Sequence, residues 1–184
     1  MRSRSPTGRP LMLLATCWIT TVALLATSLT LAGPTQAMDT QSIALLGVHL
    51  QNDNAAFEPT SDAERARMAK VEELFKAQLQ DSHKFSFVAI PPDLQKRIAD
   101  GQAVGACGGC ELAYGKELGT QLVAWIDVQK VSNLILNMNV YMADVSSGKL
   151  VFLRSVDIRG NTDESWTRSL AFLVKRYLLP SFGA

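Results

Sequence analysis

Apolar and polar positions follow two different periods along this chain, and the period changes near its middle. Residues 43–50 are almost continuously apolar, which predicts a short buried strand. A pattern of period 3.6 follows and begins with a capping box formed by Ser61 and Glu64, so a helix is expected to about Asp81. Residues 84–90 predict a second strand, which completes a βαβ unit.

Two short helices and a glycine-rich loop come next. The first helix is expected from Asp93 to about Gly101, and the second from Glu111 to Leu118, where Gly119 ends it. From there the period becomes two, which predicts three strands in an antiparallel meander. These strands are expected at residues 122–131, 134–145 and 150–158.

The last periodic segment predicts a helix from about Glu164 to Leu179. Pro180 is expected to end this helix, because proline disfavours a helical conformation in the residue before it. The predicted apolar stripe consists of Trp166, Leu170, Leu173, Val174 and Tyr177. The complete order of elements favours an α/β fold, in which a βαβ unit and a three-strand antiparallel meander form a single mixed β-sheet covered by helices.

Residues 1–37 have the organisation of an export signal. The basic stretch MRSRSPTGRP precedes the apolar run LMLLATCWITTVALLATSLTLAG, and the small residues of TQA suit cleavage after Ala37. We therefore predict a signal peptide at 1–37 and a single α/β domain at 38–184 in the periplasm. The apolar run exceeds the usual signal core of about 7–15 residues, so an uncleaved membrane anchor is the alternative interpretation. Cys17 lies inside this run and is assigned to the removed segment.

The charge balance argues against a nucleic-acid partner. Loss of the three arginines before residue 38 lowers Lys plus Arg from 18 to 15 against 17 Asp plus Glu, so the formal charge changes from +1 to −2. Phosphate binding requires clustered lysine and arginine, and the remaining basic residues are scattered.

Two of the chain's three cysteines, Cys107 and Cys110, form the motif CGGC. Haem attachment requires histidine directly after the second cysteine, and this position holds Glu111. A zinc site needs two more ligands, but His49 and His83 are far from the motif and from each other in sequence. In an oxidising compartment the pair is expected to form a structural disulfide, and a thiol-disulfide redox site is the alternative.

Alternate positions of two predicted strands form a candidate binding surface. Period-two geometry places them on shared sheet faces, unusually rich in amides. The candidate residues are Trp125, Asp127, Gln129, Asn137, Asn139 and Tyr141. Antiparallel sheets commonly expose one polar side, so a solvated outer face is the simpler interpretation and a recognition surface is the functional one.

A second candidate is the acidic loop before the last helix. It contains Asp157, Arg159, Asn161, Asp163 and Glu164. Oxygen ligands suggest a hard cation, but the spacing does not match an EF-hand loop. Capping of the last helix is the favoured interpretation, with its acidic residues complementing the positive helix end, and no metal site is predicted.

The segment GTQLVAWIDVQKVSNLILNMNVYMADVSSGKLV resembles the amino-terminal domain of TolB and the CsgG-type envelope proteins. Together with CGGCELA and SVDIRGNTDESW, it also resembles a family of small exported bacterial proteins of unknown function. The resemblance implies a periplasmic module that meets other proteins. The chain lacks the lipid-attachment cysteine of CsgG and the propeller repeats of TolB, so pore formation and TolB's own partners are not implied.

The sequence contains no G-x-S-x-G, HExxH or phosphate-loop motif. We therefore predict a non-enzymatic binding or accessory module of the cell envelope that requires no cofactor. Its expected partner is another envelope protein, with membrane contact only through the N-terminal segment if that segment is uncleaved. The alternative is a thiol-disulfide redox protein that uses the CGGC motif.

Overall fold

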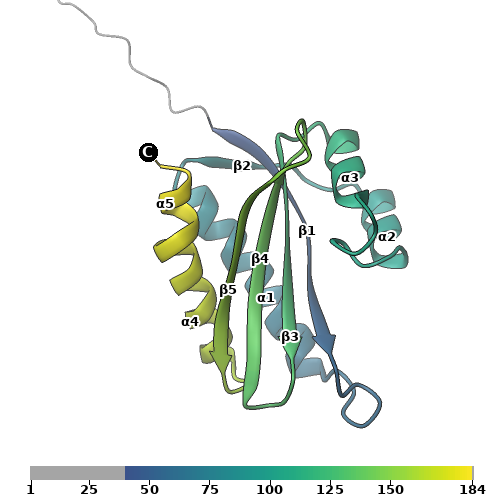
Figure 1. Ribbon diagram of the computed structural model, residues 1–184, viewed down its shortest axis with the longest axis vertical. Coiled ribbons are helices and arrows are strands. Elements are labelled where there is room, and N and C mark those ends of the chain that lie inside the picture. The colour runs from purple at the N-terminus through teal and green to yellow at the C-terminus, as the bar shows by residue number, and fades with distance from the viewer. Residues whose placement is uncertain (1–39, 184) are drawn as a thin grey trace, which may run out of the picture. The chain divides into compact units, whose positions relative to one another are not determined.

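The computed structural model describes residues 40–183, so the predicted signal peptide lies outside the described residues. The described residues form a five-stranded sheet with helices on both faces (Figure 1). Its strand order is β2-β1-β3-β4-β5. The α/β fold predicted from the sequence, with a single mixed sheet, is confirmed.

The parallel and antiparallel parts of the sheet meet at β3. β1 (Gln41–Asn52) is parallel to β2 (Phe85–Phe87) and to β3 (Leu122–Lys130). β3, β4 (Ile135–Asp144) and β5 (Leu150–Arg159) form the predicted antiparallel meander. β2 is shorter than the predicted strand 84–90: its pairing with β1 ends at Phe87, and the chain then leads to Pro91 and Pro92, where α2 begins.

The helices α1 (Asp62–Asp81) and α4 (Asp163–Leu173) cover one face of the sheet. The capping box of α1 is present: Ser61 Oγ accepts from the Glu64 amide, and Glu64 Oε2 accepts from the Ser61 amide. Phe75 and Trp166 are fully buried in the main core between these helices and the sheet. This face is closed by apolar packing.

A smaller core lies on the opposite face. α2 (Pro92–Asp100) and α3 (Cys110–Leu118) contribute Leu94, Ile98 and Leu112 to it, and the sheet contributes Val123 and Trp125. Figure 1 shows both helices gathered at one end of this face, beside β1. The middle of this face carries mostly polar side chains, and Leu153 and Ile135 are exposed apolar residues on the same side.

The last helix continues past its predicted end at Pro180. A π-helical turn, Val174–Leu178, follows α4 and leads into the short α5 (Leu179–Ser181), which includes Pro180. A proline ring clashes with the carbonyl four residues earlier, and the wider π turn relieves this clash. The extra residue also shifts the buried stripe, so Leu178 is fully buried and Tyr177 only partly.

Among residues 40–183, no helix combines the length and the apolar character that crossing a membrane requires.

Candidate functional site

The β3–β4 pairing brings the six predicted surface residues onto one sheet face. Trp125 lies opposite Tyr141, Asp127 opposite Asn139, and Gln129 opposite Asn137. Opposite residues in an antiparallel pair point to the same side of the sheet.

The neighbouring strands β1 and β5 extend two of these pairs into rows across the sheet. One row consists of His49, Asp127, Asn139 and Ser155, and the other of Gln51, Gln129, Asn137 and Asp157. We call these eight residues the polar face. The sequence pattern identified its β3 and β4 residues and assigned Asp157 to the acidic loop. It missed His49, Gln51 and Ser155.

The polar face is linked internally by its amides. Asn139 Nδ2 donates to Asn137 Oδ1 at 2.8 Å, and Asn137 Nδ2 donates to Gln129 Oε1 at 3.5 Å. These amides are half-buried. Each amide has two N–H donors and an oxygen acceptor, so each retains hydrogen-bonding capacity for a partner.

His49 and Asp127 lie at the β1 side of the polar face. His49 Nδ1 is 3.4 Å from Asp127 Oδ1, within ion-pair distance but without hydrogen-bond geometry. The Asp127 side chain is only 12% exposed, whereas the His49 side chain is 34% exposed. The histidine is therefore the accessible member of the pair.

Trp125 differs from the sequence-based expectation, because it is only 4% exposed. The loop before α3 covers it: a Cβ atom on Gly105 would lie 2.7 Å from Trp125 Nε1. The indole stacks on Tyr141 with ring centroids 5.0 Å apart. Burial, with the charge of Asp127 as a second cause, raises the pKa of Tyr141. Trp125 thus supports the partly exposed Tyr141 ring and is not itself available to a partner.

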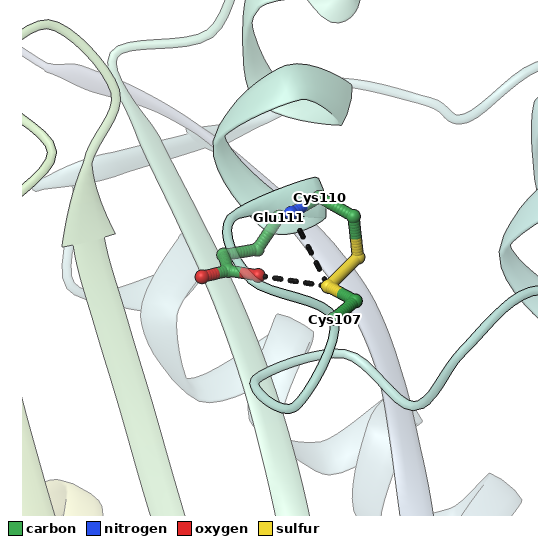
Figure 2. The surroundings of a disulfide bond; sticks show 3 residues. All are labelled: Cys107, Cys110 and Glu111. Atoms are coloured by element: carbon green, nitrogen blue, oxygen red, sulfur yellow. Dashed lines mark hydrogen bonds between the residues drawn. A yellow bond between two sulfur atoms is a disulfide. The ribbon is translucent and has the colours of Figure 1, made fainter.

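Cys107 and Cys110 are joined by a disulfide at the start of α3 (Figure 2). Gly108 and Gly109 have φ values of +70° and +109°, which glycine adopts far more readily than other residues. The Cys110 amide donates to Cys107 Sγ at 3.2 Å. The predicted disulfide is confirmed, and the two glycines explain how so short a bridge can close.

Glu111 places a carboxylate beside this disulfide. Its Oε2 lies 3.2 Å from Cys107 Sγ (Figure 2). A disulfide sulfur carries no proton, so this contact becomes a hydrogen bond only after reduction. The ligand atoms of Cys107, Cys110 and Glu111 lie within 4.8 Å of one another, but the bridge occupies both sulfurs and leaves no thiolate for a metal.

The acidic loop does not bring its carboxylates together. Asp163 accepts from Arg67 Nε at 2.7 Å, and Glu164 pairs with Arg168 in the next helical turn. Asp157 belongs to the polar face. Thr162 caps α4, because its hydroxyl accepts from the Ser165 amide at 3.2 Å. The capping interpretation is therefore supported and the cation hypothesis is not.

Asn161, from the same loop, points inward and joins a buried network. Its Nδ2 donates to Glu64 Oε1 at 2.7 Å, and its Oδ1 accepts from Trp166 Nε1 at 3.0 Å. Lys130 Nζ lies 2.7 Å from the same Glu64 oxygen and 3.0 Å from Glu58 Oε1. Lys130 was not predicted as a special residue, although it continues the buried alternation of β3.

Lys130 and Glu64 are both ionised despite near-complete burial. Burial opposes the charge on Glu64, but hydrogen bonds from Lys130, Ser61 and Asn161 outweigh it and lower the pKa of this carboxyl to about 2. Burial likewise opposes the charge on Lys130, yet the bonds to Glu64 and Glu58 raise the pKa of this ammonium. The network fixes the loops at one end of the sheet.

These features define a small α/β domain: helices cover one sheet face, whereas α2 and α3 cover only one end of the other face, whose middle is mostly polar. The chain belongs to the DUF3280 family, described as "Protein of unknown function (DUF2380)", which matches residues 41–178. No relative matches among the curated proteins.

Solved structures with a similar course of the chain come from bacteria. The LpoB C-terminal domain from Salmonella enterica is 13% identical, with a TM-score of 0.47 over 65% of this chain and 82% of that chain. The hypothetical protein CT253 from Chlamydia trachomatis is 12% identical, with a TM-score of 0.49 over 78% of this chain and 98% of that chain. Identities this low carry no information on function.

TolB from Acinetobacter baumannii is a further structure of this kind. It is 10% identical, with a TM-score of 0.42 over 76% of this chain, which spans 28% of the TolB chain. The expected likeness to CsgG-type proteins stays a prediction.

Proposed function

We propose that this protein is a non-enzymatic binding or accessory module of the bacterial cell envelope, and that its polar face contacts another envelope protein. One observation carries the proposal: two polar rows run across β1, β3, β4 and β5, whereas α2 and α3 cover the other end of this face. Side chains that only contact solvent need not be half-buried or hydrogen-bonded to one another, whereas the amides of the polar face are both.

The chemistry of the polar face suits protein recognition. Its amides supply donors and acceptors at fixed spacing, and Tyr141 offers an aromatic edge held by the buried Trp125. Tyrosine is enriched in protein interfaces, and interface rims are polar. A rigid backbone under these side chains lowers the entropy lost on binding.

The same rows argue against serine-type hydrolysis. His49, Asp127 and Ser155 share one row, which superficially resembles a catalytic triad. However, Ser155 stands three strand spacings from His49, or about 14 Å at a spacing of about 4.8 Å per strand. A base must lie within hydrogen-bond distance of the nucleophile, so these residues cannot act together.

Location in the envelope is supported by the N-terminal pattern. The basic start, the apolar run and the TQA site together support export and cleavage, which would leave the domain 38–184 in the periplasm. An uncleaved N-terminal segment would instead anchor the same domain at the membrane.

The redox alternative is favoured by one observation: the disulfide lies at the N-terminus of α3, where thiolates are stabilised. The Glu111 carboxylate beside Cys107 acts in the opposite direction, because a neighbouring negative charge disfavours a thiolate. We therefore assign the bridge a structural role, in which it fixes how the loop enters α3. An insulin-reduction assay tests this role: turnover that disappears in Cys107→Ser would establish the redox function instead.

Site-specific crosslinking in the periplasm tests the proposed function. A photo-crosslinking amino acid placed at Asn137 should trap a defined partner, and the same amino acid at Gln80, exposed on α1, should not. The double variant Asn137→Lys, Asn139→Lys should lose this partner while Gln80→Lys retains it. Equal trapping from both positions, or full retention of the partner by the double variant, would refute recognition by the polar face.

A further inference from the structure

β5 is an edge strand of the sheet and pairs only with β4 among the described residues. α4 closes its C-terminal end: Ser169 Oγ donates to the Asp157 carbonyl at 2.9 Å, and Ser165 Oγ donates to the Arg159 carbonyl at 2.9 Å. These two side chains replace a neighbouring strand at that end.

The preceding part of this edge has no such cover. The Asp157 carbonyl points away from β4, and backbone groups in an antiparallel strand alternate between its two sides. The backbones of Ser155 and Leu153 therefore also point outward, where no described residue forms a hydrogen bond with them. This stretch can accept a further strand.

Natural edge strands are usually protected by charged side chains, prolines or short length. β5 is ten residues long and contains no proline. Its side chains next to the open stretch include Val151 and Leu153, which are 43% and 51% exposed. Arg154, the charge best placed to protect the edge, instead lies over the Tyr177 ring, 5.3 Å from its centroid.

The helical side of this edge is aromatic and basic. Tyr177 contacts Phe172 edge-on at 5.6 Å, and Phe172 is 52% exposed. A hollow of about 370 Å³ beside Phe172 is lined by Arg168, Ala171, Lys175 and Arg176. Lys175 and Arg176 thus gather around Phe172, together with Arg168, which also pairs with Glu164. Phe172 contacts Tyr177, which lies under Arg154.

This local positive charge contrasts with the formal charge of −2 on the domain from residue 38 onward. The contrast specifies a negatively charged partner for this surface. Outward-facing backbone groups require an extended partner that pairs by main-chain hydrogen bonds. An alternating strand would present one set of side chains to Arg154 and Arg176 and the other set to Val151 and Leu153.

We propose that the β5 edge from Val151 to Ser155 binds an extended, acidic segment of a partner protein as an added strand. Acidic side chains of this segment face the basic surface formed by α4 and the π-helical turn after it. Its apolar side chains pack beside Val151 and Leu153. Ser155 belongs to both surfaces. The added strand, however, contacts the outward backbone of β5 and Arg176, whereas the proposed function is tested at Asn137 and Asn139, so the two tests can fail independently.

Peptides of about ten residues test the proposal on the mature chain. One alternates Glu and Val, a second alternates Lys and Val, and a third groups all its Glu residues before its Val residues. Fluorescence anisotropy at low and physiological salt should show binding of the alternating Glu–Val peptide alone. Hydrogen exchange followed by NMR should show new protection of the Leu153 and Ser155 amides when this peptide is bound.

Variants locate the binding. Arg176→Glu should weaken the alternating Glu–Val peptide by at least about tenfold, whereas Lys96→Glu, an equal charge change on α2, should have no effect. Leu153→Pro removes an outward N–H donor and should also weaken binding, since proline is tolerated on free edges. If Leu153→Pro does not fold, the proposal is tested by the amide protection and by the effect of Arg176→Glu on peptide affinity.

Three outcomes would overturn the proposal. Equal binding of the grouped peptide without amide protection would mean general charge attraction. Binding of phosphatidylglycerol vesicles at the same residues, with no binding of the alternating peptide, would mean a lipid-facing surface. Equal affinity for the Lys–Val peptide would show that the basic residues beside β5 do not select an acidic segment.

Discussion

Lys130 Nζ lies 2.7 Å from Glu64 Oε1, and both residues are only 1% exposed. The pair connects the end of β3 to the first turn of α1. Asn133 and Asn161 reach the same network from the turns before β4 and α4, through Glu58 and Glu64 respectively. Loops that are distant in sequence are therefore held together by one buried charge pair.

Glu64→Gln should destabilise the domain strongly, because it leaves the buried Lys130 ammonium without its closest counter-charge. Removing one partner of a buried ion pair costs about 3–5 kcal/mol. Because Lys130 keeps its contact with Glu58, we expect a loss near the lower end of this range. Urea unfolding followed by circular dichroism measures this free energy. Glu73→Gln, which breaks the exposed pair with Lys70, is the matched control and should cost less than about 1 kcal/mol. Equal effects of the two substitutions would contradict the role assigned to Glu64.

Ionisation of Glu64 should contribute to the pH dependence of the protein's stability. Its folded-state pKa is lowered from 4.5 to about 2, so its contribution is complete above the unfolded pKa and is lost as the pH falls through this interval. Thermal melts from pH 6 to about pH 2 should therefore decline more steeply for the native chain than for Glu64→Gln. Asp144, whose pKa is also lowered to about 2 by Ser146 and Ser147, titrates in both proteins and cancels in the comparison. Parallel pH profiles would show that Glu64 is not ionised by these contacts.

The positions that the sequence predicted well are those governed by local geometry. Period-two alternation placed Asp127 and Asn139 on one face, because the polar set of each strand is opposite an apolar set that must face the core. The capping box at Ser61 was equally predictable, since it involves residues three apart.

The burial of Trp125 and Lys130 was not predicted, because it depends on segments that approach from elsewhere in the chain. Trp125 is buried because the loop at Gly105 crosses it, and no alternation along β3 reveals that crossing. Lys130 has a charged side chain that suggests exposure, but its counter-charges at Glu58 and Glu64 come from another segment. Such placements follow from tertiary packing and not from sequence period.

The mature protein should contain the Cys107–Cys110 bridge and have a mass lower by about two hydrogens than the dithiol. Replacement of both cysteines by serine should lower the free energy of unfolding by about 1–3 kcal/mol, because so short a loop restricts the unfolded chain only slightly. Alkylation of the native protein under non-reducing conditions, followed by mass spectrometry, checks the first expectation. Stoichiometric labelling of Cys107 and Cys110 would mean free thiols and would favour a redox or metal role.

Export should remove the first 37 residues, so that the exported protein begins near Met38 and fractionates with soluble periplasmic material. Intact-mass measurement on that fraction gives the cleavage position directly. A full-length mass found with the membranes would identify the apolar run as an uncleaved anchor.

Gly115 allows α3 to approach the sheet closely. A Cβ atom at this position would lie 2.6 Å from Val145 Cγ2 and 2.7 Å from Val123 Cγ1. Helix propensity alone predicts that Gly115→Ala stabilises the protein by about 0.5–1 kcal/mol. Overpacking against two buried, branched side chains predicts the opposite, a loss of about 1–3 kcal/mol.

We expect overpacking to dominate at Gly115, because the valines belong to the buried sheet core and cannot swing aside as a flexible side chain would. Urea unfolding of Gly115→Ala, Val145→Ala and the double variant forms a double-mutant cycle. The space vacated by Val145→Ala should accept the new methyl group, so the double variant should be more stable than the sum of the single effects predicts. Strict additivity of the two single effects, or a Gly115→Ala variant more stable than the native chain, would show that α3 can move away from the sheet at no cost.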